Sequence, residues 1–313
     1  MNNKALRWVG FGLMILSLAF VVYKIVNLDL SSVAVDFSFG GTAFLIIALV
    51  FQTLSVLFLG MLFKRNVSYG SKGKNIPLKR AVYEYCRSNL GKYIPGNVFQ
   101  YVERNLFFST YGIPHIDSVI ASLMEVICLV LGGIGICAAT EQFPVIINVL
   151  SDHSYMLIVF LVLVVIFIVI AIVLIRAKKN RIRDVFVRIT DRGLHIIITS
   201  NFIAYAAILV LMGIVTILSS FGIAGFELSL NEAISLFGAY ITAWICGFII
   251  VGAPGGIGVR EAVFMLIYRD DPKLGSILAL SILVRVISVL ADILAFVVSW
   301  AVCGRKNKTG IDS

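Results

Sequence analysis

Runs of about twenty apolar residues recur along the chain, and they most constrain what it can fold into. An α-helix rises 1.5 Å per residue, so roughly 20 residues cross a hydrocarbon core of about 30 Å. Runs of this length lie at 8–27, 41–63, 116–139, 155–175, 195–218 and 277–302. Because 60% of the residues are hydrophobic and only 14% are charged, a water-soluble core could not absorb this apolar surface. The sequence predicts an all-α, polytopic integral membrane protein.

The first apolar run could also be interpreted as a signal peptide, since Lys4 and Arg7 precede it. The run is longer than a typical signal-peptide core, and no pattern of small residues for cleavage follows before Asn27. We therefore expect the segment to be retained as the first of six spanning helices.

The basic residues are distributed unevenly between the segments that separate the apolar runs. They concentrate in 64–80, 176–194 and the tail 303–313, whereas 28–39, 140–153 and 219–230 contain no lysine or arginine. Cytoplasmic loops of membrane proteins carry such an excess. We therefore attribute the net charge of +9 to topology and not to nucleic-acid binding. The pattern predicts a plasma-membrane protein with both termini in the cytoplasm, and anionic lipids as a possible secondary partner of the basic loops.

Two further segments contain Pro-Gly turns and fit poorly as simple spans. Segment 81–111 is too polar to cross a bilayer, and a turn at 93–97 divides it into two short helical halves. Segment 231–270 is interrupted by the glycine-rich stretch 252–258. Irregular backbone at membrane depth is tolerated where it lines a cavity. We predict two re-entrant helical hairpins, although a full crossing at 231–252, with the tail outside, is the alternative for the second.

This arrangement implies an internal repeat within one transmembrane domain that covers residues 1–313. The order span, span, hairpin, span occurs at about 8–139 and again, with opposite orientation, at about 155–302. Inverted repeats with interrupted helices are typical of transporters, because broken helices offer helix ends that bind polar groups near the midplane.

Ionisable residues lie deep within the apolar runs 116–139 and 277–302. Arg285 and Asp292 share one helical face with Ser281 and Ser288, and Glu125 lies in 116–139. Arg285 and Asp292 are about 10 Å apart along a helix axis, so each should have another partner. Charged groups within a membrane are costly and usually functional. Two interpretations stay open and are compatible: a structural ion pair between Glu125 and Arg285 that clamps the repeats, or a substrate path.

An Arg-Glu pair lies near each Pro-Gly turn. We favour an anion-binding role for these turns over a role as simple hinges. Backbone N–H groups at the start of a half-helix attract anions such as a lipid phosphate. The predicted headgroup site comprises Lys92, Pro95, Gly96, Asn97, Tyr101, Glu103, Arg104, Glu125, Pro254, Gly255, Gly256, Gly258, Arg260, Glu261, Arg285 and Asp292. We expect no metal and no cofactor, because the cysteines and histidines are scattered without ligand spacing.

The two turn motifs resemble the signature stretches of the lysylphosphatidylglycerol synthase transmembrane family. The motifs are Gly91-Lys92-Tyr93-Ile94-Pro95-Gly96-Asn97, with Tyr101 downstream, and Ala253-Pro254-Gly255-Gly256-Ile257-Gly258-Val259-Arg260-Glu261. That family includes the flippase half of the bacterial multiple peptide resistance factor. The resemblance implies a flippase-like protein that moves aminoacylated phosphatidylglycerol or a related lipid between leaflets and contributes to antimicrobial peptide resistance.

The two-part relatives carry lysyl transfer on a separate soluble domain, and the sequence here has no such domain before Ser313. We therefore expect no catalytic residues and no transferase activity in this chain. The alternative is a membrane subunit or scaffold for a separate lipid-modifying enzyme of the phosphatidylglycerol lysyltransferase or glycosyltransferase type.

Overall fold

The computed structural model describes residues 36, 38–70, 76–93, 99–140, 192–249, 256 and 258–304, and their regular elements are helices. The predicted spans 8–27 and 155–175 lie outside the described residues. In chain order the elements are α2 (Phe39–Gly70), α3 (Leu78–Asn89), the 3₁₀ helix η2 (Leu90–Tyr93), α4 (Phe99–Thr110), α5 (His115–Ala139), α9 (Arg192–Ser220), α10 (Leu230–Ile249), α11 (Val259–Ile267) and α12 (Leu274–Gly304).

Four of the described helices are long and apolar enough to cross a membrane. They cover Phe39–Tyr69, His115–Ala139, Thr199–Ser220 and Leu274–Cys303, where four of the six spans were predicted. The sequence-based boundary of the first of these was wrong. Helix α2 continues through Lys64 and Arg65 to Gly70, because a helix that leaves the apolar layer can keep its own backbone hydrogen bonds.

Large apolar side chains cover the outer surface of these four helices. Ile46 on α2, Leu131 on α5, Ile203 on α9 and Trp300 on α12 are all more than half exposed. A water-soluble protein rarely exposes apolar surface on this scale. The exposed side chains therefore fit a lipid environment, and the described part of the chain is a helical membrane protein.

Helices α2 and α9 run antiparallel, and contacts at both ends of the pair define this arrangement. At one end, the Asp36 N–H donates to the Gly222 carbonyl at 2.9 Å. At the other end, Arg65 Nη2 donates to Ser200 Oγ at 3.1 Å. The C-terminal end of α2 therefore lies beside the start of α9.

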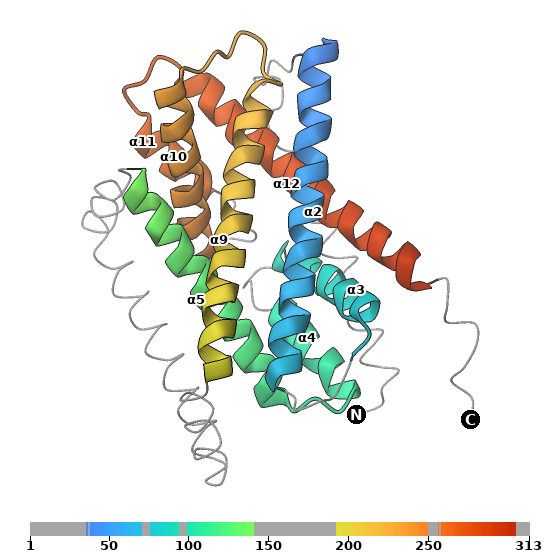
Figure 1. Cartoon of the computed structure of the whole chain (residues 1–313). Helices are drawn as coiled ribbons and strands as arrows, with labels where there is room; N and C mark the ends of the chain where they lie inside the picture. The colour runs from blue at the N-terminus through green and yellow to red at the C-terminus, as the bar shows by residue number, and fades with distance from the viewer. Residues whose placement is uncertain are drawn as a thin grey trace.

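The shorter helices lie at opposite ends of the bundle (Figure 1). Arg80 at the start of α3 contacts Cys303 at the end of α12, with Nη1 3.9 Å from Sγ. Glu232 at the start of α10 instead pairs with Lys273 beside the start of α12, at 2.6 Å. Helices α3 and α4 flank residues 94–98, as predicted for the first turn, and the turn itself lies outside the described residues.

Helix α10 approaches its neighbours closely at two glycines. A Cβ on Gly213 of α9 would lie 2.2 Å from the ring of Phe237, and a Cβ on Gly133 of α5 would lie 2.5 Å from Ile245. Small residues at helix contacts permit such close approach in membranes. Helix α10 therefore packs tightly against both α5 and α9.

The helix contacts follow a paired pattern. Helix α2 packs on α3, α5 and α12, and α9 packs on α10, α12 and α5. In the same way, α4 packs on α5 while α11 packs on α12. Exchanging α2 with α9, α3 with α10, α4 with α11 and α5 with α12 therefore reproduces the set of contacts.

Candidate functional site

A cavity of about 100 Å³, lined by both charged and apolar side chains, lies at the centre of the bundle. A volume of this size holds several water molecules or a group as large as a phosphate. Each of the described helices contributes to its wall, which consists of Gln52, Val56, Leu59, Tyr85, Asn89, Lys92, Tyr93, Gln100, Tyr101, Glu125, Leu129, Met212, Tyr240, Trp244, Gly247, Phe248, Arg260, Arg285 and Ser288.

A buried ion pair joins α4 to α5 beside this cavity. Arg104 Nη1 lies 2.9 Å from Glu125 Oε2, and the two side chains are only 1% and 6% exposed. Tyr85 of α3 donates its hydroxyl to the second carboxylate oxygen at 2.6 Å, and Arg104 Nε donates to Ser88 Oγ at 2.9 Å. The guanidinium also lies over the Tyr85 ring, 3.8 Å from its centroid. The Arg104–Glu125 ion pair and its hydrogen bonds therefore connect α3, α4 and α5.

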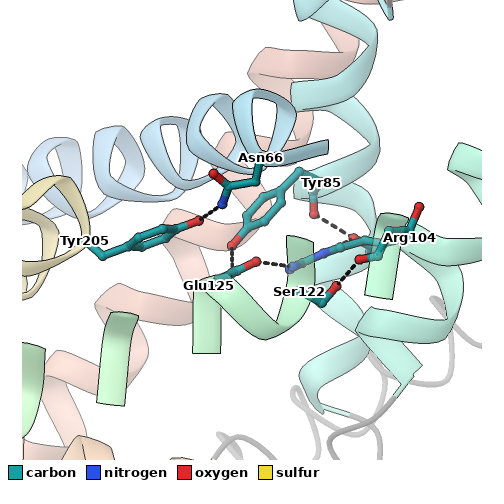
Figure 2. Close-up of polar contacts among 8 residues, drawn as sticks. Asn66, Tyr85, Arg104, Ser122, Glu125 and Tyr205 are labelled. Carbon is teal, nitrogen blue, oxygen red and sulfur yellow. Dashed lines mark hydrogen bonds and ion pairs between the residues drawn. The ribbon is translucent and has the colours of Figure 1, made fainter. Parts of the chain in front are cut away.

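Figure 2 shows this ion pair and a second polar group that approaches it from α2 and α9. Asn66 Nδ2 donates to the Tyr205 hydroxyl at 3.2 Å, and Asn201 Nδ2 donates to Asn66 Oδ1 at 2.6 Å. Arg65 in turn donates to Asn201 Oδ1. Polar contacts therefore extend from Arg65 into the bundle as far as Tyr205.

Asp292 of α12 is the centre of a second charged cluster. The residue is 1% exposed, and its carboxylate lies 2.7 Å from Lys92 Nζ. Asn89 Nδ2 donates to it at 2.8 Å, and the Tyr93 hydroxyl donates to the other oxygen. All three partners come from the end of α3 and from η2. Asp292 thereby holds the end of α3 and η2 against α12, and Lys92 remains on the cavity wall.

Arg285 of α12 lies in the third cluster, beside the start of α11. Its Nη2 is 3.1 Å from Glu261 Oε1 and 3.0 Å from the Gly256 carbonyl oxygen. Glu261 also accepts the Gly258 N–H at 2.8 Å. Gly256 and Gly258 have φ angles of 73° and 86°, in the left-handed region that favours glycine. The backbone before α11 is thus shaped so that a carbonyl and a carboxylate both face Arg285.

Arg260 differs from the other cationic groups of the cavity. Within the described part of the chain, no carboxylate lies within salt-bridge distance of Arg260. A Cβ on Gly247 would lie 3.1 Å from its Cγ, so the side chain packs closely on α10. The guanidinium is held on the cavity wall by this packing.

The structure brings together most of the described residues that the sequence singled out. Lys92, Tyr101, Glu125, Arg260 and Arg285 line the cavity, and the side chains that pair with this group are Arg104, Glu261 and Asp292. Gly256 and Gly258 lie beside them, before α11. The predicted residues Pro95, Gly96, Asn97, Pro254 and Gly255 lie outside the described residues.

One sequence-based pairing and one predicted site residue differ from the structure. Glu125 pairs with Arg104 and Arg285 pairs with Glu261, so the predicted ion pair between Glu125 and Arg285 is wrong. Glu125 and Arg285 each pair within their own half of the chain, because the preceding short helix brings an opposite charge closer. Glu103 contacts Arg87 at 2.8 Å and is not part of the cavity wall.

The prediction that Arg285 and Asp292 each have a separate partner is confirmed. Arg285 binds Glu261, and Asp292 binds Lys92. Sequence reasoning missed Gln52, although it is the one amide within the apolar run 41–63. It also missed Asn89, which no short-range pattern connects to Asp292 more than two hundred residues later.

The described residues contain no group of three or more His, Cys, Asp and Glu side chains that could hold a metal ion. Comparisons of the chain with protein-family models, curated proteins and solved structures found no match. The family resemblance of the two turn motifs therefore stays a prediction, and the function is argued from the site alone.

Proposed function

We propose that the protein is a lipid translocator that moves a phospholipid headgroup through the central cavity while the acyl chains stay in the bilayer. One observation carries the proposal: a cavity walled by three cationic side chains lies within helices that are apolar enough to span a membrane. The cationic wall consists of Lys92, Arg260 and Arg285. Fixed arginines and lysines are the groups that recognise phosphate oxygens in proteins.

The proposed architecture comprises six spans and two re-entrant hairpins in an inverted repeat. The paired pattern of helix contacts supports this arrangement, since exchanging the helices of one half for those of the other reproduces the contacts. Inverted repeats of this kind place a binding site between two halves that can rock against each other. The cavity has that position, because helices of both halves line it.

The proposed orientation places both termini in the cytoplasm. The C-terminal end of α2, the starts of α3 and α9 and the end of α12 lie at one end of the bundle. The basic segments 64–80, 176–194 and 303–313 adjoin these same points of the chain. Gathering the basic segments on one side is what the positive-inside rule requires.

Reconstitution in liposomes tests the proposal directly. Purified protein is incorporated with chain-labelled phospholipids, and a membrane-impermeant quencher reports how much label reaches the outer leaflet. We expect faster leaflet exchange than in empty liposomes, and slower exchange after Arg285→Ala or Glu125→Ala. Absence of exchange for every lipid class would contradict the proposal. Exposed Arg269→Gln, remote from the cavity, is the matched control and should exchange lipids at the wild-type rate.

Topology is tested separately with a variant that keeps Cys303 and replaces the other cysteines. We expect Cys303, at the end of α12, to react with a thiol reagent supplied from the cytoplasmic side. Labelling from the outer side would reject the second hairpin and favour a full crossing at 231–252.

A further inference from the structure

Four buried polar atoms on the cavity wall have no hydrogen-bond partner among the described residues. They are Gln52 Oε1, Arg260 Nε, Arg285 Nε and Arg285 Nη1. Gln52 is 4% exposed and the Arg285 side chain is 11% exposed, so neither reaches bulk solvent easily. Buried donors and acceptors are nearly always paired in native structures. These atoms indicate a ligand that offers acceptor oxygens to the arginines and a donor to the glutamine.

The charges around the cavity do not cancel. The ionisable wall residues and their direct ion-pair partners comprise four cationic and three anionic groups, namely Lys92, Arg104, Arg260 and Arg285 against Glu125, Glu261 and Asp292. The adjoining turn residues 94–98 and 250–257 contain no ionisable side chain and so cannot supply the missing charge. Among the described residues one positive charge is therefore left without a counter-ion, and a buried charge is unfavourable unless it is paired.

The unpartnered atoms also lie on different helices, which constrains the shape of the ligand. The arginine donors come from α11 and α12, whereas Gln52 comes from the middle of α2. A phosphate alone would satisfy the arginines but has few protons to give the glutamine carbonyl. A phosphate attached to a hydroxylated group satisfies both. The stacked rings of Trp244 and Phe248, with centroids 5.2 Å apart, add an apolar face for the C–H groups of such a ligand.

We propose, on the basis of the translocator function above, that the cavity selects anionic phosphodiester lipids with a neutral, hydroxylated headgroup over zwitterionic and aminoacylated lipids. Such a headgroup is a glycerol or a sugar. Its single negative charge balances the positive charge of the cavity, and its hydroxyls donate to Gln52. An ammonium would instead enter among Lys92, Arg260 and Arg285, where like charges repel it. This proposal differs from the lysylated lipid that the motif resemblance implies, and the two are distinguished by the experiments below.

A binding experiment with detergent-solubilised protein tests the selectivity without requiring transport. Titration calorimetry compares glycerophosphoglycerol, glycerophosphoethanolamine and inorganic phosphate. We expect glycerophosphoglycerol to bind at least about tenfold more tightly than either of the others, since a site built for hydroxyl donors rejects ligands that lack them or add a charge. Equal affinity for inorganic phosphate would overturn the proposal in favour of a simple anion site. Equal affinity for the ethanolamine compound, or no saturable binding, would also overturn it.

Liposome exchange of chain-labelled lipids separates this proposal from the translocator function. We expect phosphatidylglycerol to exchange at least about tenfold faster than phosphatidylethanolamine or lysylphosphatidylglycerol. Selective binding without exchange of any lipid would support the selectivity and reject the translocator. Exchange of all lipids at equal rates would support the translocator and reject the selectivity.

Gln52→Glu tests the charge argument with an expected loss of selectivity. The added carboxylate removes the excess positive charge, so the preference for phosphatidylglycerol over phosphatidylethanolamine should fall by about tenfold. A general loss of fold would lower both rates alike and would not change their ratio. Arg260→Gln, which also removes one positive charge, is the second variant and should shift the ratio in the same direction. Wild-type ratios in both folded variants would overturn the proposal, and Arg269→Gln is the matched control because that arginine is 76% exposed.

Discussion

Glu125→Gln should destabilise the protein strongly, because it removes one partner of the most buried ion pair in the described residues. Arg104 Nη1 and Glu125 Oε2 are 2.9 Å apart, with side chains 1% and 6% exposed. Two unit charges about 4 Å apart attract by about 4 kcal/mol at an effective dielectric of about 20. Glutamine keeps an acceptor for Tyr85 but leaves the Arg104 charge buried without a counter-ion. Breaking such a pair costs about 3–5 kcal/mol, and we expect Glu125→Gln to fall in that range.

The measurement is the free energy of unfolding from sodium dodecyl sulfate titration in mixed micelles, followed by circular dichroism. The variants are Glu125→Gln, Arg104→Met and the double variant, which removes both charges. We expect the double variant to be more stable than the sum of the single costs predicts, by about 2–4 kcal/mol, because it leaves no unpaired charge. The exposed pair Arg269–Asp270 provides the control, and its removal should change nothing measurable. A cost below about 1 kcal/mol for Glu125→Gln, or additive single costs, would refute the reasoning.

Three further predictions concern the second half of the chain and the Asp292 cluster. In the same assay, Lys92→Met should lower the free energy of unfolding by about 2–3 kcal/mol, because it leaves a buried carboxylate without its cation. Asp292→Asn should lower it by only about 1 kcal/mol, because the remaining lysine is 28% exposed and can turn to water. Gly256→Ala should cost about 1–3 kcal/mol, since its φ is 73° and a Cβ would lie 3.0 Å from Gly247 Cα, whereas Gly135→Ala, with open space around it, should cost nothing. Lys273 and Ser229 hold the pKa of Glu232 at about 2, below its usual value of 4.5, so its contribution to stability is present above about pH 4.5 and is lost as pH falls towards 2. Glu232→Gln should therefore flatten the decline in melting temperature between pH 5 and about pH 2.5, and an unchanged decline would contradict the assignment.

Much of the helical architecture could be predicted from the sequence because the bilayer makes length and hydropathy decisive. A segment of about twenty apolar residues must be a helix in hydrocarbon, since no water is available to satisfy its backbone groups. The predicted spans 116–139 and 195–218 accordingly differ by only a few residues from α5 and α9. The short helices on either side of residues 94–98 were also predictable, because proline and glycine interrupt the helical pattern there.

The sequence also indicated that Glu125, Arg285 and Asp292 matter, because each is a costly exception in an apolar run. Their partners could not be derived from it. A charge within a membrane needs a counter-ion, but the sequence contains many opposite charges and does not indicate which of them lies nearby. Sequence spacing suggested a pair between Glu125 and Arg285, and the packing of α4 on α5 and of α11 on α12 gave each a nearer partner.

The sequence by itself therefore determined that the protein is helical, that it belongs in a membrane and that a few buried charges lie within it. These properties depend on local composition and on the cost of placing polar groups in hydrocarbon. Only the tertiary structure decided which charges cancel and which do not. Arg260 lacks a carboxylate partner among the described residues, and Gln52 faces the same cavity from a helix two hundred residues earlier. That juxtaposition depends on how the two halves pack against each other, and no single segment encodes it.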